Sequence, residues 1–179
     1  MRKIILALAM SLDGYIAREN GDVDWLRMED LTEAADEMKE FFASVDVILW
    51  GRKTYTKGLE MGGDIGMYGN KIKNYIFSRT PQTSEHENLQ FVSENVNEFV
   101  RDLKRQEGKN IYLMGGGILA KTFFEAGLID EIILSIQPTI LGTGISLFLP
   151  HDKQTELELT DVKTRKSGSV QISYRMKKR

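Results

Sequence analysis

The chain has 179 residues, with 24 lysines and arginines against 26 aspartates and glutamates, two histidines and no cysteine. Without cysteine it can form no disulfide, thiol nucleophile or thiolate metal site, and two histidines leave a zinc site short of ligands, so no metal is expected. The net charge of −2 offers no basic face for nucleic acid, and no apolar run approaches the roughly 20 residues that span a bilayer.

The length fits one domain, and we expect residues 1–179 to form it. The apolar opening is too short for a signal peptide, and no small-residue cleavage site follows it. We therefore expect a soluble, cytoplasmic protein with neither nucleic-acid nor membrane partners. The placement of its 16 glycines is then the most informative feature of the composition.

Apolar periodicity predicts alternating strands and helices in the first half of the chain. A nearly continuous apolar run is typical of a strand buried on both faces, whereas apolar residues three and four apart indicate a helix. We expect strands at 3–10 and 45–50, a helix from Asp30 or Thr32 to Ser44 between them, a short helical turn at 53–57 and a glycine-rich loop at 58–70.

The second half continues this alternation and ends in a hairpin. Ser167-Gly168 is a hairpin signal between two strands, which should therefore be antiparallel. The whole pattern predicts a three-layer α/β/α sandwich with a mostly parallel mixed sheet and a C-terminal antiparallel hairpin. The elements expected here are strands at 72–78, 89–92, 110–114 and 130–137, helices at 96–106 and 118–126, and final strands near 155–165 and 169–177.

Three predicted strand ends carry groups that suit an anion. Gly115-Gly116-Gly117 stands between a strand and a helix, where backbone N–H groups can face phosphate, although three glycines equally fit a tight turn. Gly51-Arg52-Lys53-Thr54 and Phe77-Ser78-Arg79-Thr80 also follow strands. Ligands in open α/β sheets bind outside the carboxyl ends of strands, so these segments predict a site for a phosphate-rich nucleotide. The triplet is not the G-x-G-x-x-G fingerprint, which argues against a Rossmann domain.

Together with other segments, these strand ends resemble the dihydrofolate reductase superfamily. The resemblance rests on Ala7–Ala17, Trp25, the three strand ends, and the block 127–144, where Gly-Leu-Ile-Asp-Glu is followed by a proline and by Leu-Gly-Thr-Gly. Ser-Leu-Asp-Gly at 11–14 and the block are similar to the branch typified by the C-terminal reductase domain of the bifunctional riboflavin-biosynthesis protein (RibD). The resemblance covers nearly the whole chain and implies a dihydrofolate reductase-like fold.

This resemblance implies an NADPH-dependent reductase that takes a small-molecule substrate and forms a homodimer. Arginines that pair with a 2′-phosphate dianion would favour NADPH over NADH. By match to the family motifs, the cofactor residues would be Ala9, Gly14 and Ile16 at the nicotinamide, Gly51, Arg52 and Thr54 at phosphate, Ser78 and Arg79 at the 2′-phosphate, and Gly115, Gly116, Gly117, Ile118 and Leu119 around the pyrophosphate, with Met114 beside them.

The catalytic carboxylate has several candidates. Asp36 is the nearest match to the helix carboxylate with which dihydrofolate reductases bind the pterin, but Asp30, Glu33 and Glu37 compete with it. Ser135 matches a hydroxyl position that supports this carboxylate. We therefore predict Asp36 as a catalytic and substrate-binding residue, with Ser135 assisting it.

Two further residues keep two interpretations each. Asp13 either handles a substrate proton or is only the turn former that its Asp-Gly context suggests. Trp25 either lines the substrate pocket, as the family match implies, or anchors a loop. Asp13 is thus a second catalytic candidate, and Trp25 a second substrate-binding one.

The predicted activity is hydride transfer from NADPH to a pyrimidine- or pterin-like heterocycle, resembling the 5-amino-6-(5-phosphoribosylamino)uracil reductase of riboflavin biosynthesis. Dihydrofolate is the second substrate class, weakened because Ile72 stands at the position of the arginine that grips the glutamate tail of folate. A third interpretation is a nucleotide-binding regulatory protein without turnover, because no catalytic carboxylate is clearly placed.

Overall fold

The computed structural model describes residues 1–27, 32–63, 71–152 and 154–177. Its main sheet has the strand order β5-β4-β3-β6-β1-β7-β10-β9, and β2 and β8 form a separate two-stranded ribbon. The strands are β1 (Ile4–Ser11), β2 (Tyr15–Ala17), β3 (Val45–Gly51), β4 (Lys73–Phe77), β5 (Leu89–Val92), β6 (Asn110–Gly115), β7 (Glu131–Gln137), β8 (Ile145–Ser146), β9 (Leu157–Thr164) and β10 (Val170–Met176). The helices are α2 (Ala35–Ala43), α3 (Arg52–Glu60), α4 (Val96–Arg105) and α5 (Gly117–Glu125).

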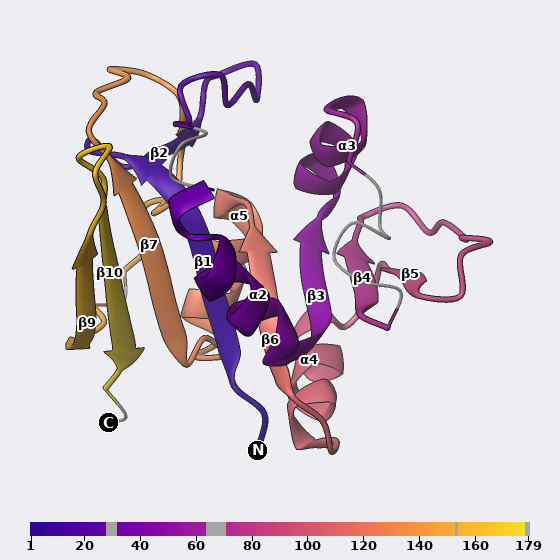
Figure 1. The fold of residues 1–179 in the computed structure, drawn as a ribbon. Coiled ribbons are helices and arrows are strands. Elements are labelled where there is room, and N and C mark those ends of the chain that lie inside the picture. Colours follow the sequence, from indigo (N-terminus) through magenta and orange to yellow (C-terminus); the bar gives the residue numbers. More distant parts are fainter. Residues whose placement is uncertain (28–31, 64–70, 153, 178–179) are drawn as a thin grey trace.

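Helices cover both faces of the sheet (Figure 1). Val100 of α4 and Phe123 of α5 are fully buried in the larger apolar cluster, on one face. Phe41 of α2 and Tyr55 of α3 pack against the smaller cluster, on the other face. This arrangement confirms the predicted three-layer α/β/α sandwich.

The sheet is mostly parallel. Every neighbouring pair from β5 to β7 runs parallel, and only β10 runs against its neighbours β7 and β9. Parallel strands covered on both faces need apolar side chains at successive positions. Residues 4–6 of β1 and 47–49 of β3 meet this need, since each is at most 4% exposed. The parallel sheet and the antiparallel final hairpin were both predicted.

Two helix boundaries differ from the prediction. Helix α3 continues to Glu60, beyond the expected short turn, and Gly58 is helical with open space around its Cβ position. Helix α2 begins at Ala35 after a break at Ala34, and Asp30, the earliest predicted start, lies outside the described residues. Residues 64–70 of the predicted glycine-rich loop also lie outside them. No helix in the described parts of the chain is long and apolar enough to cross a membrane.

Candidate functional site

The carboxyl ends of β3 and β6 bring two helix starts side by side. Gly51 is the N-cap of α3 and Gly116 the N-cap of α5, and neither helix receives a side-chain capping hydrogen bond. A Cβ on Gly51 would lie 3.3 Å from the carbonyl oxygen of Gly115 and 3.5 Å from the nitrogen of Gly116. The first-turn N–H groups of both helices therefore lack intrahelical partners in one place, where they favour an anion such as phosphate.

The glycine turn before α5 is packed closely against α3 and β2. Gly115 has a φ of +102°, which favours glycine, and the Gly115–Gly116 peptide is cis. A Cβ on Gly116 would lie 3.3 Å from Oγ1 of Thr54 and 3.6 Å from Cδ1 of Ile16. The structure thus brings together three residues that the sequence assigns to one cofactor site.

The ribbon of β2 and β8 lies beside the start of α5. The N–H of Leu147 donates to the carbonyl of Gly14 at 3.1 Å, next to the pairing of β2 with β8. A Cβ on Gly117 would lie 2.3 Å from the carbonyl oxygen of Ser146, so only glycine fits there. The predicted nicotinamide loop and the predicted pyrophosphate turn are therefore neighbours.

Asp13 joins the loop that follows β1 to the loop that precedes β8. Its carboxylate accepts hydrogen bonds from the Ser11 hydroxyl at 2.6 Å, the Gly142 N–H at 2.8 Å and the Leu141 N–H at 3.1 Å. These hydrogen bonds hold the pKa of Asp13 below its ordinary value, and the bond from Ser11 has the largest effect. A carboxylate engaged in this way is a poor proton donor, so the geometry favours the turn-forming interpretation over the proton-handling one.

The two predicted arginines meet at the loop that follows β4, which contains Arg79 and contacts Arg52. Arg52 donates from Nη1 to Oε1 of Gln82 at 2.6 Å, and its guanidinium carbon lies 5.5 Å from the ring centre of Phe91. Arg79 is exposed in the loop that follows β4, which also carries Gln82, and it has no hydrogen bond or ion pair with the described residues. Ser78 precedes it, half-buried. Both arginines are therefore at the loop that follows β4, and their joint binding of one anion stays a prediction.

The remaining predicted cofactor residues differ in burial. Ala9 and Met114 are half-buried on the neighbouring strands β1 and β6. Ile118 is 62% exposed at the start of α5, whereas Leu119 is 8% exposed and belongs to the larger apolar cluster. Leu119 can therefore meet a ligand only through its backbone.

The two residues predicted to act together in catalysis, Asp36 and Ser135, do not contact each other through a hydrogen bond. Asp36 is exposed in the first turn of α2, and no hydrogen bond joins it to Ser135 in the described structure. Ser135 instead accepts a hydrogen bond from Nε2 of Gln137 at 3.1 Å. It lies in register between Ala9 of β1 and Gln171 of β10, on the same face of the sheet. The support of a helix carboxylate by this hydroxyl thus stays a prediction.

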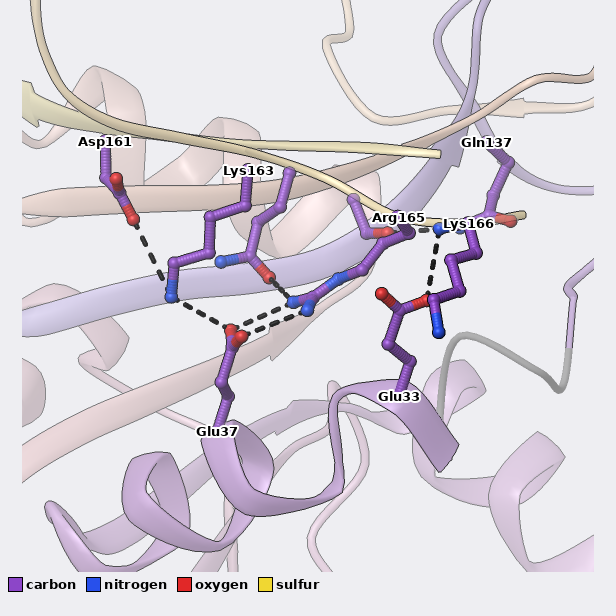
Figure 2. A network of polar contacts seen from close by, with 9 residues as sticks. Glu33, Glu37, Gln137, Asp161, Lys163, Arg165 and Lys166 are labelled. Carbon is purple, nitrogen blue, oxygen red and sulfur yellow. Dashed lines mark hydrogen bonds and ion pairs between the residues drawn. The ribbon is translucent and has the colours of Figure 1, made fainter. Parts of the chain in front are cut away.

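Glu37, a rival of Asp36 in the sequence, ties α2 to the final hairpin (Figure 2). Its carboxylate accepts from Arg165 at 3.0 and 2.9 Å, and Nζ of Lys163 lies 3.1 Å away. Hydrogen bonding by Arg165 is the largest cause that lowers the pKa of Glu37 to about 2. Glu37 is therefore ionised and engaged at neutral pH. We call Glu37, Lys163 and Arg165 the hairpin clasp.

The hairpin clasp reaches toward the predicted nicotinamide position. Nη2 of Arg165 lies 3.4 Å from Oε1 of Gln171, which is two strands from Ala9, about 10 Å across the sheet. Glu33, another rival acid, accepts from the N–H of Lys166 at 3.1 Å and adds a second tie between the helix and the hairpin. The sequence did not predict these hairpin residues, since only the docking of α2 brings them near the site.

Trp25 keeps a hydrogen-bond donor available. It is 8% exposed, and its Nε1 has no partner among the described residues. Buried indole N–H groups usually find a partner, as Nε1 of Trp50 does with Oδ1 of Asn74 at 2.8 Å. A donor without a partner among the described residues favours the pocket interpretation of Trp25 over the loop-anchor one.

A hollow of about 600 Å³ opens at the opposite end of the strands and is not part of this site. Its Arg2 is paired with Asp46 and also donates to the carbonyl of Lys109 at 2.6 Å, so its buried cation is already neutralised. The hollow is lined by Met1, Arg2, Ala43, Ser44, Arg105, Gln106, Glu107, Gly108, Lys109 and Asn110.

Sequence comparison identifies relatives over almost the whole chain. The family model of the RibD C-terminal domain matches residues 2–172. The uncharacterized protein YyaP of Bacillus subtilis (strain 168) is 36% identical over 182 residues, which cover 97% of this chain and 94% of YyaP.

Three solved structures share the fold. A protein of Shewanella sp. PV-4 assigned to riboflavin biosynthesis has a TM-score of 0.83 at 22% identity and covers 98% of this chain and 99% of its own. A deaminase/5-amino-6-(5-phosphoribosylamino)uracil reductase of Thermotoga maritima has a TM-score of 0.70 at 16% identity, with 98% and 56% covered. Dihydrofolate reductase of Enterococcus faecalis, complexed with NADP(H), has a TM-score of 0.67 at 14% identity, with 98% and 97% covered. These likenesses confirm the dihydrofolate reductase-like fold.

Proposed function

Because this chain belongs to the family of RibD C-terminal domains, we propose that it is an NADPH-dependent reductase that transfers a hydride to a pyrimidine- or pterin-like heterocycle. The meeting of two uncapped helix starts, at Gly51 and Gly116, carries this proposal. It provides N–H donors and positive dipole ends at the point where the family match expects the phosphates of a dinucleotide.

The residues around these helix starts fit NADPH. The N–H groups that begin α3 and α5 would hold the pyrophosphate, and the missing Cβ of Gly116 leaves backbone open beside the hydroxyl of Thr54. Arg52 and Arg79 would hold the 2′-phosphate through charge-assisted hydrogen bonds. Ile16 would border the nicotinamide. NADPH, when bound, supplies the hydride.

The sheet face beside Ala9 would take the substrate ring. Ser135 stands one strand away on the same face, and Gln137 donates to its hydroxyl. The half-buried hydroxyl of Ser135 can bond to a carbonyl or amino group of a pyrimidine or pterin edge, and buried Gln137 would orient that hydroxyl. Asp13 would keep the two adjoining loops in place, which orients the ring and limits the entry of water.

The proposal also extends to the proton donor and to the identity of the heterocycle. Asp36 is exposed to solvent and would deliver a proton directly or through water, whereas the carboxylate of Glu37 accepts hydrogen bonds from Arg165. Folate is the less favoured substrate, because buried Ile72, 7% exposed, offers no charge to a glutamate tail. A uracil-type heterocycle, the substrate named for the Thermotoga maritima relative, needs no such arginine.

Binding and turnover test the proposal separately. Thermal shift and calorimetric titration with NADPH and NADH measure binding, and the loss of NADPH absorbance with a panel of uracil derivatives, pterins, dihydrofolate and simple carbonyls measures turnover. Saturable NADPH binding with oxidation by a uracil or pterin compound is the expected result. Binding of neither nucleotide would refute the proposal, and tight binding without turnover would favour the nucleotide-binding regulatory protein.

A further inference from the structure

The face of the sheet beside Ala9 is accessible although its strands lie inside the sheet. Strands β1, β7 and β10 each have a neighbouring strand on both sides. On this face Ala9 of β1 lies beside Ser135 of β7, which in turn lies beside Gln171 of β10. All three residues are half-buried, whereas residues 4–6 of β1 are at most 4% exposed. A ligand can therefore reach this row of side chains.

Arg165 determines which end of the Gln171 amide faces the hairpin clasp. Nη2 of Arg165 lies 3.4 Å from Oε1 of Gln171. A guanidinium group has N–H donors and no acceptor, so the amide must present its oxygen to Arg165 and its NH2 group away from it. Nε2 of Gln171 makes no hydrogen bond with the described residues. Two N–H donors of Gln171 therefore remain for a ligand.

The orientation of Arg165 is itself restricted. Its two terminal nitrogens donate to the two oxygens of Glu37 at 3.0 and 2.9 Å, and Figure 2 shows the guanidinium group turned toward this carboxylate. The Arg165 side chain is 9% exposed. A bidentate pair limits the rotation of a guanidinium group. Arg165 is therefore placed to orient Gln171 rather than to meet a ligand itself.

Ser135 adds a second donor next to this amide. Its oxygen accepts from Nε2 of Gln137 at 3.1 Å, and its own hydrogen has no acceptor among the described residues. A hydroxyl has one hydrogen and two lone pairs, so Ser135 can still donate to a carbonyl or accept from an amino group. Ser135 thus suits either kind of ring edge, whereas Gln171 turns only donors toward the ligand.

Beyond Gln171 the row ends in a cation. Lys163 of β9 lies in register with Gln171, and its Nζ is 3.1 Å from the carboxylate of Glu37. Both oxygens of Glu37 also accept from Arg165. The row from Ser135 to Lys163 therefore presents donors, and the carboxylate of the hairpin clasp is bonded to cations. Such a surface favours a ring edge made of acceptors.

We propose that Gln171 is a specificity-determining residue that donates from Nε2 to a ring carbonyl of the substrate, and that Arg165 is the positioning residue that holds its amide in this orientation. The inference rests on the proposed reductase function and selects between the two ring classes considered there. A pyrimidine-2,4-dione has two carbonyl oxygens that flank one ring nitrogen, so Ser135 and Gln171 can each bond to one of them.

A 2-amino-4-oxo ring, as in pterins, is disfavoured by the same geometry. It replaces one carbonyl oxygen with an NH2 group, and this group would oppose the NH2 group of Gln171. Two donors that face each other leave both without a partner. A site built to bond one polar group discriminates against an analogue that cannot form that bond.

Lumazine and pterin form a matched pair of probes for this proposal. They share one bicyclic ring system and differ at position 2, where lumazine has a carbonyl and pterin an amino group. Fluorescence titration of the full chain, without nucleotide and with NADP+, measures the binding of each probe. The wild-type chain should bind lumazine about tenfold more tightly than pterin.

Variants of Gln171 test the amide directly. Gln171→Glu keeps the length of the side chain and replaces the NH2 donor with an acceptor, so pterin should now bind about tenfold more tightly than lumazine. Gln171→Leu has no polar group and should bring the two affinities within about twofold of each other. Gln90→Glu, at an exposed position of β5, is the matched control and should keep the preference of the wild type.

Variants of Arg165 separate positioning from general stabilisation. Arg165→Met allows the amide of Gln171 to present either end, so the preference should fall to about twofold while pterin binds at least as well as before. Arg165→Lys keeps a donor beside Oε1 of Gln171 and should keep the preference. A merely structural role of Arg165 would instead lower both affinities together. Thermal unfolding checks that each variant is folded.

Four results would overturn the proposal. The wild-type chain could bind the two probes equally, or it could bind neither. A folded Gln171→Glu variant could still prefer lumazine. If Gln171→Glu does not fold, a folded Gln171→Leu variant with an unchanged preference has the same meaning.

The proposed function fails in a different way. A lumazine preference that Gln171→Glu reverses, in a chain that oxidises NADPH with no heterocycle, would refute the reductase and support the role of Gln171. Oxidation of NADPH by a uracil derivative together with equal binding of lumazine and pterin would support the reductase and overturn the role of Gln171.

Discussion

Acid should weaken the attachment of α2 to the final hairpin through a single carboxylate. The pKa of Glu37 is lowered from 4.5 to about 2 in the folded chain, chiefly by the hydrogen bonds from Arg165. Between these two values the unfolded chain binds the proton more readily than the folded one. Stability contributed by Glu37 is therefore complete above about pH 5 and is lost as the pH falls toward 2. Glu37→Gln removes the charge and should remove this dependence.

The magnitude follows from the exposure of the two side chains. A pKa lowered from 4.5 to about 2 corresponds to roughly 3 kcal/mol if the pair is shielded from water. The Glu37 side chain is 36% exposed, so solvent screening reduces this to about 1 kcal/mol. Arg165 is only 9% exposed and would lose its charged partner. We expect Glu37→Gln to cost about 1–2 kcal/mol of unfolding free energy at pH 7.

Urea unfolding followed by far-UV circular dichroism measures this difference at intervals from pH 7 to pH 3. The difference in unfolding free energy between wild type and Glu37→Gln should be largest at pH 7 and should fall by about half at pH 3. Asp36→Asn is the matched control, at the neighbouring exposed acid of the same helix turn. It should stay within about 0.5 kcal/mol of wild type at every pH.

Two outcomes would refute this reasoning. A gap that does not change with pH would mean that the charge of Glu37 does not hold the helix to the hairpin. The same pH dependence in Asp36→Asn would mean that the engaged acid is Asp36, which would also reopen the choice of the catalytic carboxylate.

Other predictions concern the proposed cofactor site. Gly117→Ala should destabilise the chain by about 1–3 kcal/mol, because its Cβ would lie 2.3 Å from the carbonyl oxygen of Ser146, whereas Gly58→Ala, in open space within α3, should stabilise it by about 0.5–1 kcal/mol; urea unfolding compares the two. Asp13→Ala should lower the midpoint of urea unfolding and weaken NADPH binding, measured by calorimetry, because the two hydrogen bonds between the loops and the local one from Ser11 disappear. Arg79→Ala should weaken the binding of NADPH by about 1–3 kcal/mol and leave the binding of NADH unchanged. Equal losses of binding for both nucleotides would contradict the 2′-phosphate role.

Local pattern was enough to predict the sheet and most of its helices. The apolar runs at residues 4–6 and 47–49 belong to strands buried on both faces, and such strands have few other arrangements. Ser167-Gly168 predicted the final hairpin because turn chemistry acts within a few residues. The sequence predicts only a short turn where α3 lies, because glycine is a poor helix former and Gly58 therefore favours a loop.

Contacts between distant segments were not predictable in this way. Arg165 and Glu37 are 128 residues apart, and nothing near either residue indicates the other. The pairing of β2 with β8 joins Tyr15–Ala17 to Ile145–Ser146, two segments too short to be recognised as strands. Both depend on the finished fold. For the same reason the sequence could name several acids near α2 but could not say which faces the sheet.

The cofactor residues stand between these two cases. Sequence motifs predict these residues, and the structure brings Ile16, Thr54 and Gly116 within a few ångströms of one another. The sequence could not show that Leu119 lies in the apolar core or that Asp13 fastens two loops. Motif matching places a residue in a region, and packing then decides what its side chain touches.

The most direct test of the proposed function is calorimetric titration of the chain with NADPH, repeated with NADH and with the Gly116→Val variant. We predict one saturable NADPH site per chain, weaker binding of NADH, and loss of both nucleotides in Gly116→Val, whose side chain would fill the space beside Thr54 and Ile16. Absence of NADPH binding to the folded wild-type chain, or binding that Gly116→Val leaves unchanged, would contradict the cofactor site at the two helix starts.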